Sequence, residues 1–277
     1  RGLGDVYKRQ GVREGRIETI GDLSAATAEH QIDATGRVLA PGFIDVHTHD
    51  DTVVIRHPQM LPKLSQGVTT VIVGNCGISA SPVSLRSDPP DPMNLLGGAA
   101  AFVYPRFSDY RRAVESAHPA VNVAALIGHT ALRSNHMDDL HRTATPYEIA
   151  AMRVQLHESL EAGALGLSTG LAYASAFNAE TDEVLQLSEE LTAYGAVYAT
   201  HLRSEFEPVL EAMGEAFQIG RHAKAPVIIS HLKCAGAGNW GRSPQLLAAL
   251  ELAAKTHPVG CDCYPYAASS STLDLKQ

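Results

Sequence analysis

The sequence lacks any run of 18 apolar residues, and its amino-terminal stretch has no apolar signal core. The first absence argues against a membrane-spanning helix, and the second against a secretory signal. None of the four cysteines forms a C-x-x-C pair, which favours free thiols in a reducing cytosol over a disulfide framework. A net charge of -8 argues against nucleic acid or an anionic membrane as partner. We therefore expect a cytoplasmic protein that binds neither.

The length and composition support a globular protein with a full core. The chain has 277 residues, 45% of them hydrophobic, which suits one large domain or one domain with a small annex. Residues 1–10 show no period of 2 or 3.6, and we expect an artefactual leader there. Residues 11–40 predict a small β unit, with strands over residues 17–20, 31–33 and 37–39.

After Pro41, apolar strand-like runs alternate with helical patterns. Strands separated by helices predict a parallel sheet, and the continuous apolar character of the runs predicts burial on both faces. Seven strands are predicted, over residues 43–46, 69–73, 121–127, 164–167, 196–200, 227–230 and 259–263. Six helices are predicted, over residues 57–66, 107–117, 146–162, 181–194, 206–222 and 243–256.

Two α/β architectures have this alternation, a doubly wound sheet and a (β/α)₈ barrel. No G-x-G-x-x-G or P-loop follows the first strand of the alternation, so a nucleotide-binding sheet is unsupported. Polar residues fall at the carboxyl ends of the strands, where a barrel keeps its site. We therefore expect residues 41–277 to form an incomplete, metal-dependent (β/α)₈ barrel of the TIM type, truncated before strand eight.

The candidate chemistry starts at His47 and His49, directly after the first of these strands. Residues i and i+2 of a strand point the same way, so both imidazoles can reach one point beyond the strand end. Neutral imidazole is a common ligand of zinc-like metals. The alternative is a pair of surface histidines in a turn.

Three further residues follow other strands in the same manner: Cys76, His201 and His231. Each has a plainer interpretation, a buried thiol for the cysteine and a core or turn residue for either histidine. Four histidines and a potential thiolate at the same end of successive strands nevertheless favour a metal centre, and few protein ligands with an open position favour a catalytic one. His129 and Arg133 also follow a strand, and a role in the pocket and a role in loop structure both stay open. The long segment 77–106 predicts a large loop bordering the substrate.

Six segments resemble the N-acyl-D-amino-acid deacylase (D-aminoacylase) family of the amidohydrolase superfamily. They run from Ala40 to Leu273 and read APGFIDVHTHDD, GVTTVIVGNCGIS, GALGLSTGLAY, YATHLRSE, ISHLKCAGAGNWGRS and CDCYPYAASSSTL. The resemblance implies zinc-dependent hydrolysis of N-acyl-D-amino acids, small molecules, with no obligate protein partner. It also implies that residues 11–40 are part of a small N-terminal β-sandwich.

The same resemblance assigns roles to individual residues. It implies a tight zinc site, a second and weaker site that shares the cysteine, and an acyl-amino-acid pocket. The family's catalytic aspartate follows strand eight, and we expect it to lie beyond Gln277, so no residue here takes that role. The residues that match are Cys76, His201 and His231 for the tight site, His47 and His49 for the second, and Tyr173, Lys233 and Tyr264 for the pocket.

Two other functions stay open from the residues alone. One is a cyclic-amide hydrolase of the hydantoinase or dihydroorotase kind, whose members usually bridge two metals with a modified lysine on strand four. That strand reads Ala164-Leu165-Gly166-Leu167-Ser168 here and contains no lysine. The other is a catalytically inactive protein that binds metal.

Overall fold

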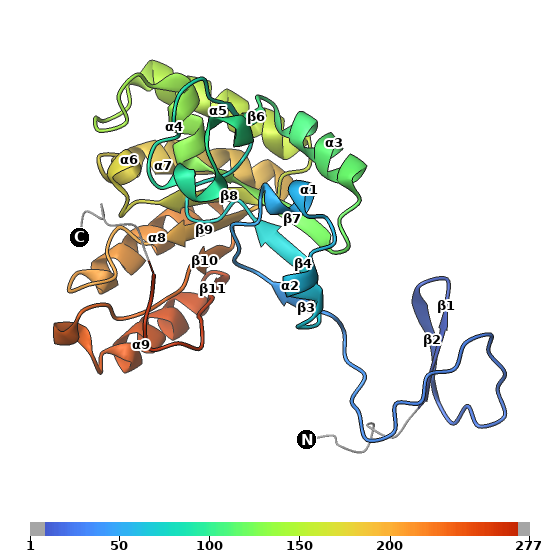
Figure 1. The fold of residues 1–277 in the computed structure, drawn as a ribbon. Helices are drawn as coiled ribbons and strands as arrows, with labels where there is room; N and C mark the ends of the chain where they lie inside the picture. The colour runs from blue at the N-terminus through green and yellow to red at the C-terminus, as the bar shows by residue number, and fades with distance from the viewer. Residues whose placement is uncertain (1–8, 271–277) are drawn as a thin grey trace. The chain divides into compact units, whose positions relative to one another are not determined.

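The seven apolar runs form a single parallel sheet in the computed structural model, which describes residues 9–270 (Figure 1). Its strand order is β11-β10-β9-β8-β7-β4-β3, and every neighbouring pair is parallel. All seven predicted strands are confirmed, with ends that shift by no more than three residues. The strands are β3 Phe43–Asp45, β4 Val68–Val73, β7 Asn122–Gly128, β8 Gly166–Gly170, β9 Val197–His201, β10 Val227–Ile229 and β11 Val259–Cys261.

The sheet curls strongly, because the two strands at opposite ends of its order approach each other at their carboxyl ends. Asp262 follows β11 and His47 follows β3, yet Asp262 Oδ2 lies 3.2 Å from His47 Nδ1. A flat doubly wound sheet would hold these strands several strand widths apart. The curl confirms the barrel prediction, with seven strands of the described chain in the parallel sheet.

Helices connect successive strands and pack against one another in chain order, α3 on α5, α5 on α7, α7 on α8 and α8 on α9. The prediction of one helix over residues 57–66 is wrong: α1 ends at Arg56, before that range, and only the short α2 lies within it. Pro58 explains the break, since proline lacks the N–H of a helix interior and disfavours helix in the preceding residue. The helices are α1 Val53–Arg56, α2 Leu61–Leu64, α3 Phe107–Ala117, α4 His129–His136, α5 Pro146–Glu161, α6 Ala174–Phe177, α7 Thr181–Ser188, α8 Val209–Ala223 and α9 Ser243–Ala254.

Helix α5 begins where the sequence predicts. Thr145 is its N-cap, and a capping box joins the Thr145 and Glu148 side chains to each other's backbone N–H groups. Pro146 occupies the first turn, where its missing N–H costs nothing. The side chains of Met152 and Leu156 then face the core, fully buried.

The connection between β4 and α3 is long and largely folded. It contains the antiparallel pair β5 Val83–Ser84 and β6 Val103–Tyr104 and the short 3₁₀ helices η2 Met93–Leu96 and η3 Ala99–Ala101. Residues 75–83 are buried throughout. The contact of this segment with substrate stays a prediction.

The amino-terminal part of the chain, which ends at Gly42, is a separate compact unit. Strands β1 Arg9–Arg13 and β2 Arg16–Gly21 form an antiparallel hairpin. Arg9 and Gln10, two residues of the expected leader, belong to β1; residues 1–8 lie outside the described part. The predicted strands over residues 31–33 and 37–39 are wrong, because Ile32 is 91% exposed and no strand pairs with either run. The assignment of residues 11–40 to part of a β-sandwich stays a prediction.

No helix among residues 9–270 is both long and apolar enough to cross a membrane.

Candidate metal centre

The turn that carries Cys76 depends on the glycines around it. Gly74 and Gly77 have φ angles of +79° and +76°, in the left-handed region that favours glycine. A Cβ on Gly74 would lie 2.1 Å from the Leu126 carbonyl oxygen, and one on Gly77 would lie 2.6 Å from the Gly170 nitrogen. Only glycine allows this approach of backbones, which explains the G-N-C-G sequence. Cys76 between them also has a positive φ, +55°, and lies 2% exposed.

A buried carboxylate ties this turn to the segment that carries His47 and His49. The Gly74 N–H donates to Asp51 Oδ2 at 3.3 Å, and the Ala80 N–H donates to Asp51 Oδ1 at 3.2 Å. Asp51 is 1% exposed, and burial raises its pKa to about 6 against the opposing influence of His49 and the two N–H donors. Asp51 therefore holds the Cys76 turn in place.

Four histidines surround the Cys76 sulfur. Sγ lies 3.2 Å from His47 Nε2 and 3.4 Å from His231 Nε2. Two sets of three residues have ligand atoms within 4.8 Å of one another: the His47 group, which is His47, His49 and Cys76, and the His231 group, which is Cys76, His201 and His231. The structure thus brings together all five residues for which the sequence predicts a metal site, and Cys76 belongs to both groups.

Carboxylates engage the outer nitrogens of two of these rings. Asp262 lies 3.2 Å from His47 Nδ1, and Glu205 lies 2.8 Å from His231 Nδ1. An Nδ1–H that donates to a carboxylate leaves the Nε2 lone pair free, and in both rings Nε2 is the atom that faces the sulfur.

The third and fourth rings leave polar atoms without a partner. His201 Nδ1 lies 3.1 Å from the Tyr173 hydroxyl, while His201 Nε2 is buried without a hydrogen-bond partner. His49 Nδ1 is also buried and unpaired. Buried polar groups are nearly always satisfied, so orphaned ring nitrogens beside a sulfur fit a metal ion as the missing partner.

Charge is separated inside this cluster. Burial opposes ionisation of Cys76, but the surrounding histidines, with His201 and His231 foremost, outweigh it and hold the thiol pKa well below its usual value. Burial also opposes protonation of His47, yet hydrogen bonds with Asp262 and Cys76 raise its pKa to about 10. Cys76 and Glu205 likewise outweigh burial and raise the pKa of His231 to about 9. In the metal-free cluster two protonated rings therefore face a thiolate, and a zinc-like cation that displaced their Nε2 protons would have the thiolate and neutral imidazoles as donors.

The three predicted pocket residues lie beside this cluster. Tyr173 is buried against His201, with ring centroids 4.7 Å apart. Lys233 Nζ lies 2.5 Å from Glu205 Oε1 and 5.5 Å above the Tyr264 ring centroid, a cation–π distance. Their contact with substrate stays a prediction.

Sequence patterns alone do not identify Glu205, Asp262 or the structural role of Asp51. Each is a carboxylate in or beside a motif that was singled out, but none has a local pattern that identifies its partner. Asp262 lies 215 residues from His47 in the chain. Only the folded sheet brings the two together.

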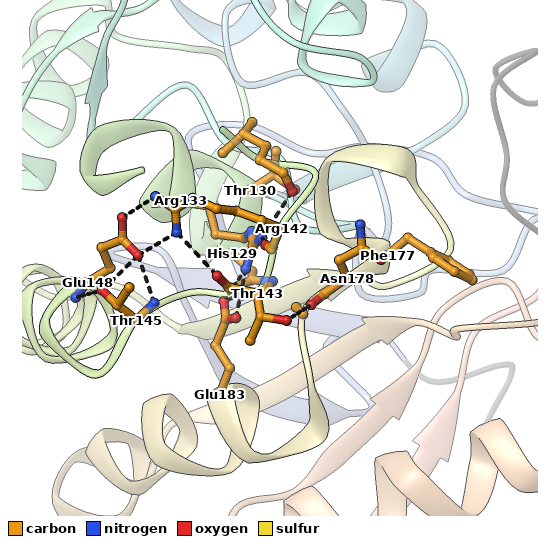
Figure 2. A network of polar contacts seen from close by, with 12 residues as sticks. His129, Thr130, Arg133, Arg142, Thr143, Thr145, Glu148, Phe177, Asn178 and Glu183 are labelled. Carbon is orange, nitrogen blue, oxygen red and sulfur yellow. Dashed lines mark hydrogen bonds and ion pairs between the residues drawn. The ribbon is translucent and has the colours of Figure 1, made fainter. Parts of the chain in front are cut away.

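His129 and Arg133 have a structural role instead of facing the cluster (Figure 2). His129 Nε2 lies 2.7 Å from Glu183 Oε1, and Arg133 donates to both Glu183 oxygens at 2.6 and 2.7 Å. All three side chains are at most 1% exposed. Arg133 also donates to the carbonyls of Leu140 and Arg142, so this network joins α4 to α7 and to the loop before α5.

An open depression of about 780 Å³ has Arg142, Asn178 and Arg203 in its lining and none of the five residues of the metal cluster. Its arginines are already paired, Arg142 with Glu148 and Arg203 with Glu215. The depression therefore offers no uncompensated positive charge, and the chemistry belongs to the histidine cluster.

Comparison with known proteins agrees with this geometry. The Amidohydrolase family matches residues 31–277. The N-acyl-D-aspartate deacylase of Alcaligenes xylosoxydans xylosoxydans is 50% identical over 271 residues, which cover 96% of this chain and 54% of the relative. The crystal structure of D-aminoacylase superposes with a TM-score of 0.91 at 48% identity, over 94% of this chain and 54% of that one.

The N-acyl-D-glutamate deacylase of Bordetella bronchiseptica was solved with zinc and a phosphonate inhibitor that mimics the tetrahedral intermediate. It superposes with a TM-score of 0.88 at 41% identity, over 94% of this chain and 54% of that chain. The chain thus spans about half the length of the relatives it matches.

Proposed function

The chain belongs to the amidohydrolase family, and from that premise we propose that the protein hydrolyses N-acyl-D-amino acids to a carboxylate and a free D-amino acid. The observation that carries the proposal is the convergence of Cys76 with four histidines in two overlapping groups. The relatives named for N-acyl-D-amino-acid substrates support this substrate class. We place the reaction in the cytoplasm, with a small molecule as the only partner.

We propose zinc as the cofactor, since a thiolate with imidazoles is a donor set that zinc favours. The tight site would be the His231 group, and a second, weaker site would be the His47 group, which shares Cys76. When bound, such an ion supplies Lewis acidity toward water and an amide carbonyl.

Tyr173 is suited to donate a hydrogen bond to the oxyanion that develops on the substrate carbonyl. Burial raises its pKa, so the hydroxyl keeps its proton. If His201 uses Nε2 for the metal, its Nδ1–H donates to the Tyr173 oxygen 3.1 Å away. The Tyr173 hydroxyl hydrogen is then free for the substrate.

Lys233 and Tyr264 are suited to bind the substrate carboxylate. An ammonium has three donors, and Glu205 takes one of those of Lys233. Nζ also lies 2.9 Å from His231 Nδ1. A remaining N–H is available to an anion, and the Tyr264 ring beneath Nζ restrains the side chain. Glu205 also accepts from His231, so it links this pocket to the metal ligands.

A carboxylate must still move a proton from water to the leaving amine. Within residues 9–270, the carboxylates beside the cluster already have partners. Asp51 accepts two backbone N–H groups, and Glu205 contacts His231 and Lys233. Asp262 contacts His47 and accepts a backbone N–H. Asp45 and Asp50 pair with Lys63. We therefore assign no acid–base residue within these residues.

The test is amine release from N-acetyl-D- and N-acetyl-L-amino acids by the zinc-loaded product of the full reading frame. Release from D substrates alone, abolished in Cys76→Ala, is the expected result. Ring opening of hydantoins or dihydropyrimidines without amine release would favour the cyclic-amide hydrolase instead, although β8 contains no lysine to bridge two metals. Metal binding with neither reaction would contradict the proposal and favour an inactive binder.

A further inference from the structure

Asp262 occupies an unusual place in the fold. It follows β11, which ends the strand order on one side, while His47 follows β3, which ends it on the other. No strand pairing connects β3 to β11, yet Asp262 Oδ2 and His47 Nδ1 are 3.2 Å apart. This carboxylate therefore spans the open side of the curled sheet, at the end that holds the cluster.

The two oxygens of Asp262 serve different partners. While Oδ2 faces His47, Oδ1 accepts the backbone N–H of His231 at 2.6 Å. His231 has a φ of +38°, an unfavourable backbone angle for a residue with a side chain, and the carboxylate is one of the contacts that hold it there. Asp262 is thus in contact with one histidine of each group.

The backbone of Asp262 is fixed as well. Its N–H donates to the Ile229 carbonyl at 3.1 Å, and its carbonyl accepts the Leu232 N–H at 3.0 Å. The side chain is only 11% exposed. Because both the backbone and the carboxylate of Asp262 are held by hydrogen bonds, Asp262 fixes the orientation of the His47 ring and not the reverse.

We propose that Asp262 is a positioning residue of the metal centre, which holds His47 with its proton on Nδ1 and its Nε2 toward Cys76, and which supports the backbone of His231. The proposal rests on the proposed metal centre and goes beyond it, because it assigns one carboxylate to both groups. Glu205 differs in this respect: among the four histidines its hydrogen bond is to His231 alone.

The variant Asp262→Asn separates these two contacts. An amide oxygen can still accept the His231 N–H, but an NH₂ group opposite His47 would force the ring proton onto Nε2 and disable that nitrogen as a ligand. Outer hydrogen-bond partners of metal-binding histidines typically contribute 10–100-fold in metal affinity. We expect zinc to bind the His47 group at least tenfold more weakly in Asp262→Asn.

The experiment is zinc titration of the metal-free chain against a chromophoric chelator, with no substrate present. Glu205→Gln should weaken the His231 group and spare the His47 group. Asp109→Asn, a carboxylate at 21% exposure that pairs with Arg106 and Arg112, should change neither. Wild-type affinity at the His47 group in folded Asp262→Asn would overturn the proposal.

A second measurement requires no substitution and covers the case in which Asp262→Asn does not fold. Long-range ¹H–¹⁵N NMR of the zinc-loaded wild-type chain should show His47 with its proton on Nδ1. A proton on Nε2, or zinc on Nδ1, would overturn the proposal. Both readouts are independent of amide hydrolysis, so the proposed function can fail while this inference stands, and the reverse.

Discussion

Replacement of Glu183 by glutamine tests the buried network of His129, Arg133 and Glu183. The substitution preserves shape and removes the negative charge opposite Arg133, whose side chain is fully buried. Arg133 keeps its hydrogen bonds to the carbonyls of Leu140 and Arg142 but loses its only charged partner among the described residues. A buried cation without a counter-charge is strongly unfavourable, so the folded state should lose stability.

Two approaches give the magnitude. Burial raises the pKa of Glu183, but hydrogen bonds and charge from His129 and Arg133 outweigh it and lower the pKa to about 2. An unfolded glutamate has a pKa of about 4.3, so the shift of roughly two units corresponds to about 3 kcal/mol of stability. Removal of one partner of a buried pair typically costs about 3–5 kcal/mol. We expect the free energy of unfolding to fall by about 3 kcal/mol at pH 7.

The assay is urea unfolding followed by circular dichroism, at pH 7 and at decreasing pH. Because the folded-state pKa is depressed, the contribution of Glu183 is complete above the unfolded pKa and is lost as the pH falls from about 4.3 toward 2. The difference between wild type and Glu183→Gln should shrink over that interval. Asp182→Asn is the control, since this neighbour on α7 bonds only Gln186 among the described residues and should change stability by less than about 0.5 kcal/mol. A loss below about 1 kcal/mol, or one independent of pH, would refute the reasoning.

Three further predictions concern the metal centre and its scaffold. Cys76→Ser should weaken zinc binding at both groups by about 100-fold or more, because the sulfur belongs to each. Competition with a chelator measures the two zinc affinities, and a loss at one group alone would contradict a shared ligand. Gly77→Ala should destabilise the fold by more than about 2 kcal/mol, since the new Cβ would lie 2.6 Å from the Gly170 nitrogen and the φ of +76° disfavours alanine. An unchanged melting temperature would contradict the close approach of the two backbones. Thr145→Ala removes the N-cap of α5, so the free energy of unfolding should fall by about 1 kcal/mol and the melting temperature by about 2–4 °C. An unchanged melting temperature in calorimetry would contradict a stabilising role of the capping box.

Local signals explain which parts of the fold could be predicted. Helix α5 begins at Pro146, as predicted, because Thr145 and Pro146 determine that boundary by short-range hydrogen bonding and a fixed φ. The helix expected over residues 57–66 fails because the apolar pattern was given more weight than Pro58. The strands expected over residues 31–33 and 37–39 fail because a strand needs a partner, which no local pattern supplies.

The candidate site likewise contains residues that local patterns predict and residues that they do not. The five residues predicted for the metal site could be found, since each follows a buried strand and parallel strands end at one edge. The supporting carboxylates could not be found. Asp262 and Glu205 contact histidines 215 and 26 residues away, and those contacts depend on the curl of the sheet and on the loop after β9.

The contact between Asp262 and His47 also has a kinetic consequence. Cys76 lies 29 residues from His47 and 155 residues from His231 in the chain. Asp262, which contacts His47, lies 215 residues from it. Contacts of such long sequence separation form late, because the entropy of closing the intervening loops must be overcome first. The His47 group has its three ligands within residues 47–76, but Asp262 reaches His47 only when the two ends of the sheet meet. Full zinc affinity at this group should therefore appear with the last cooperative step of refolding. The metal would then report on the moment at which the two ends of the sheet meet.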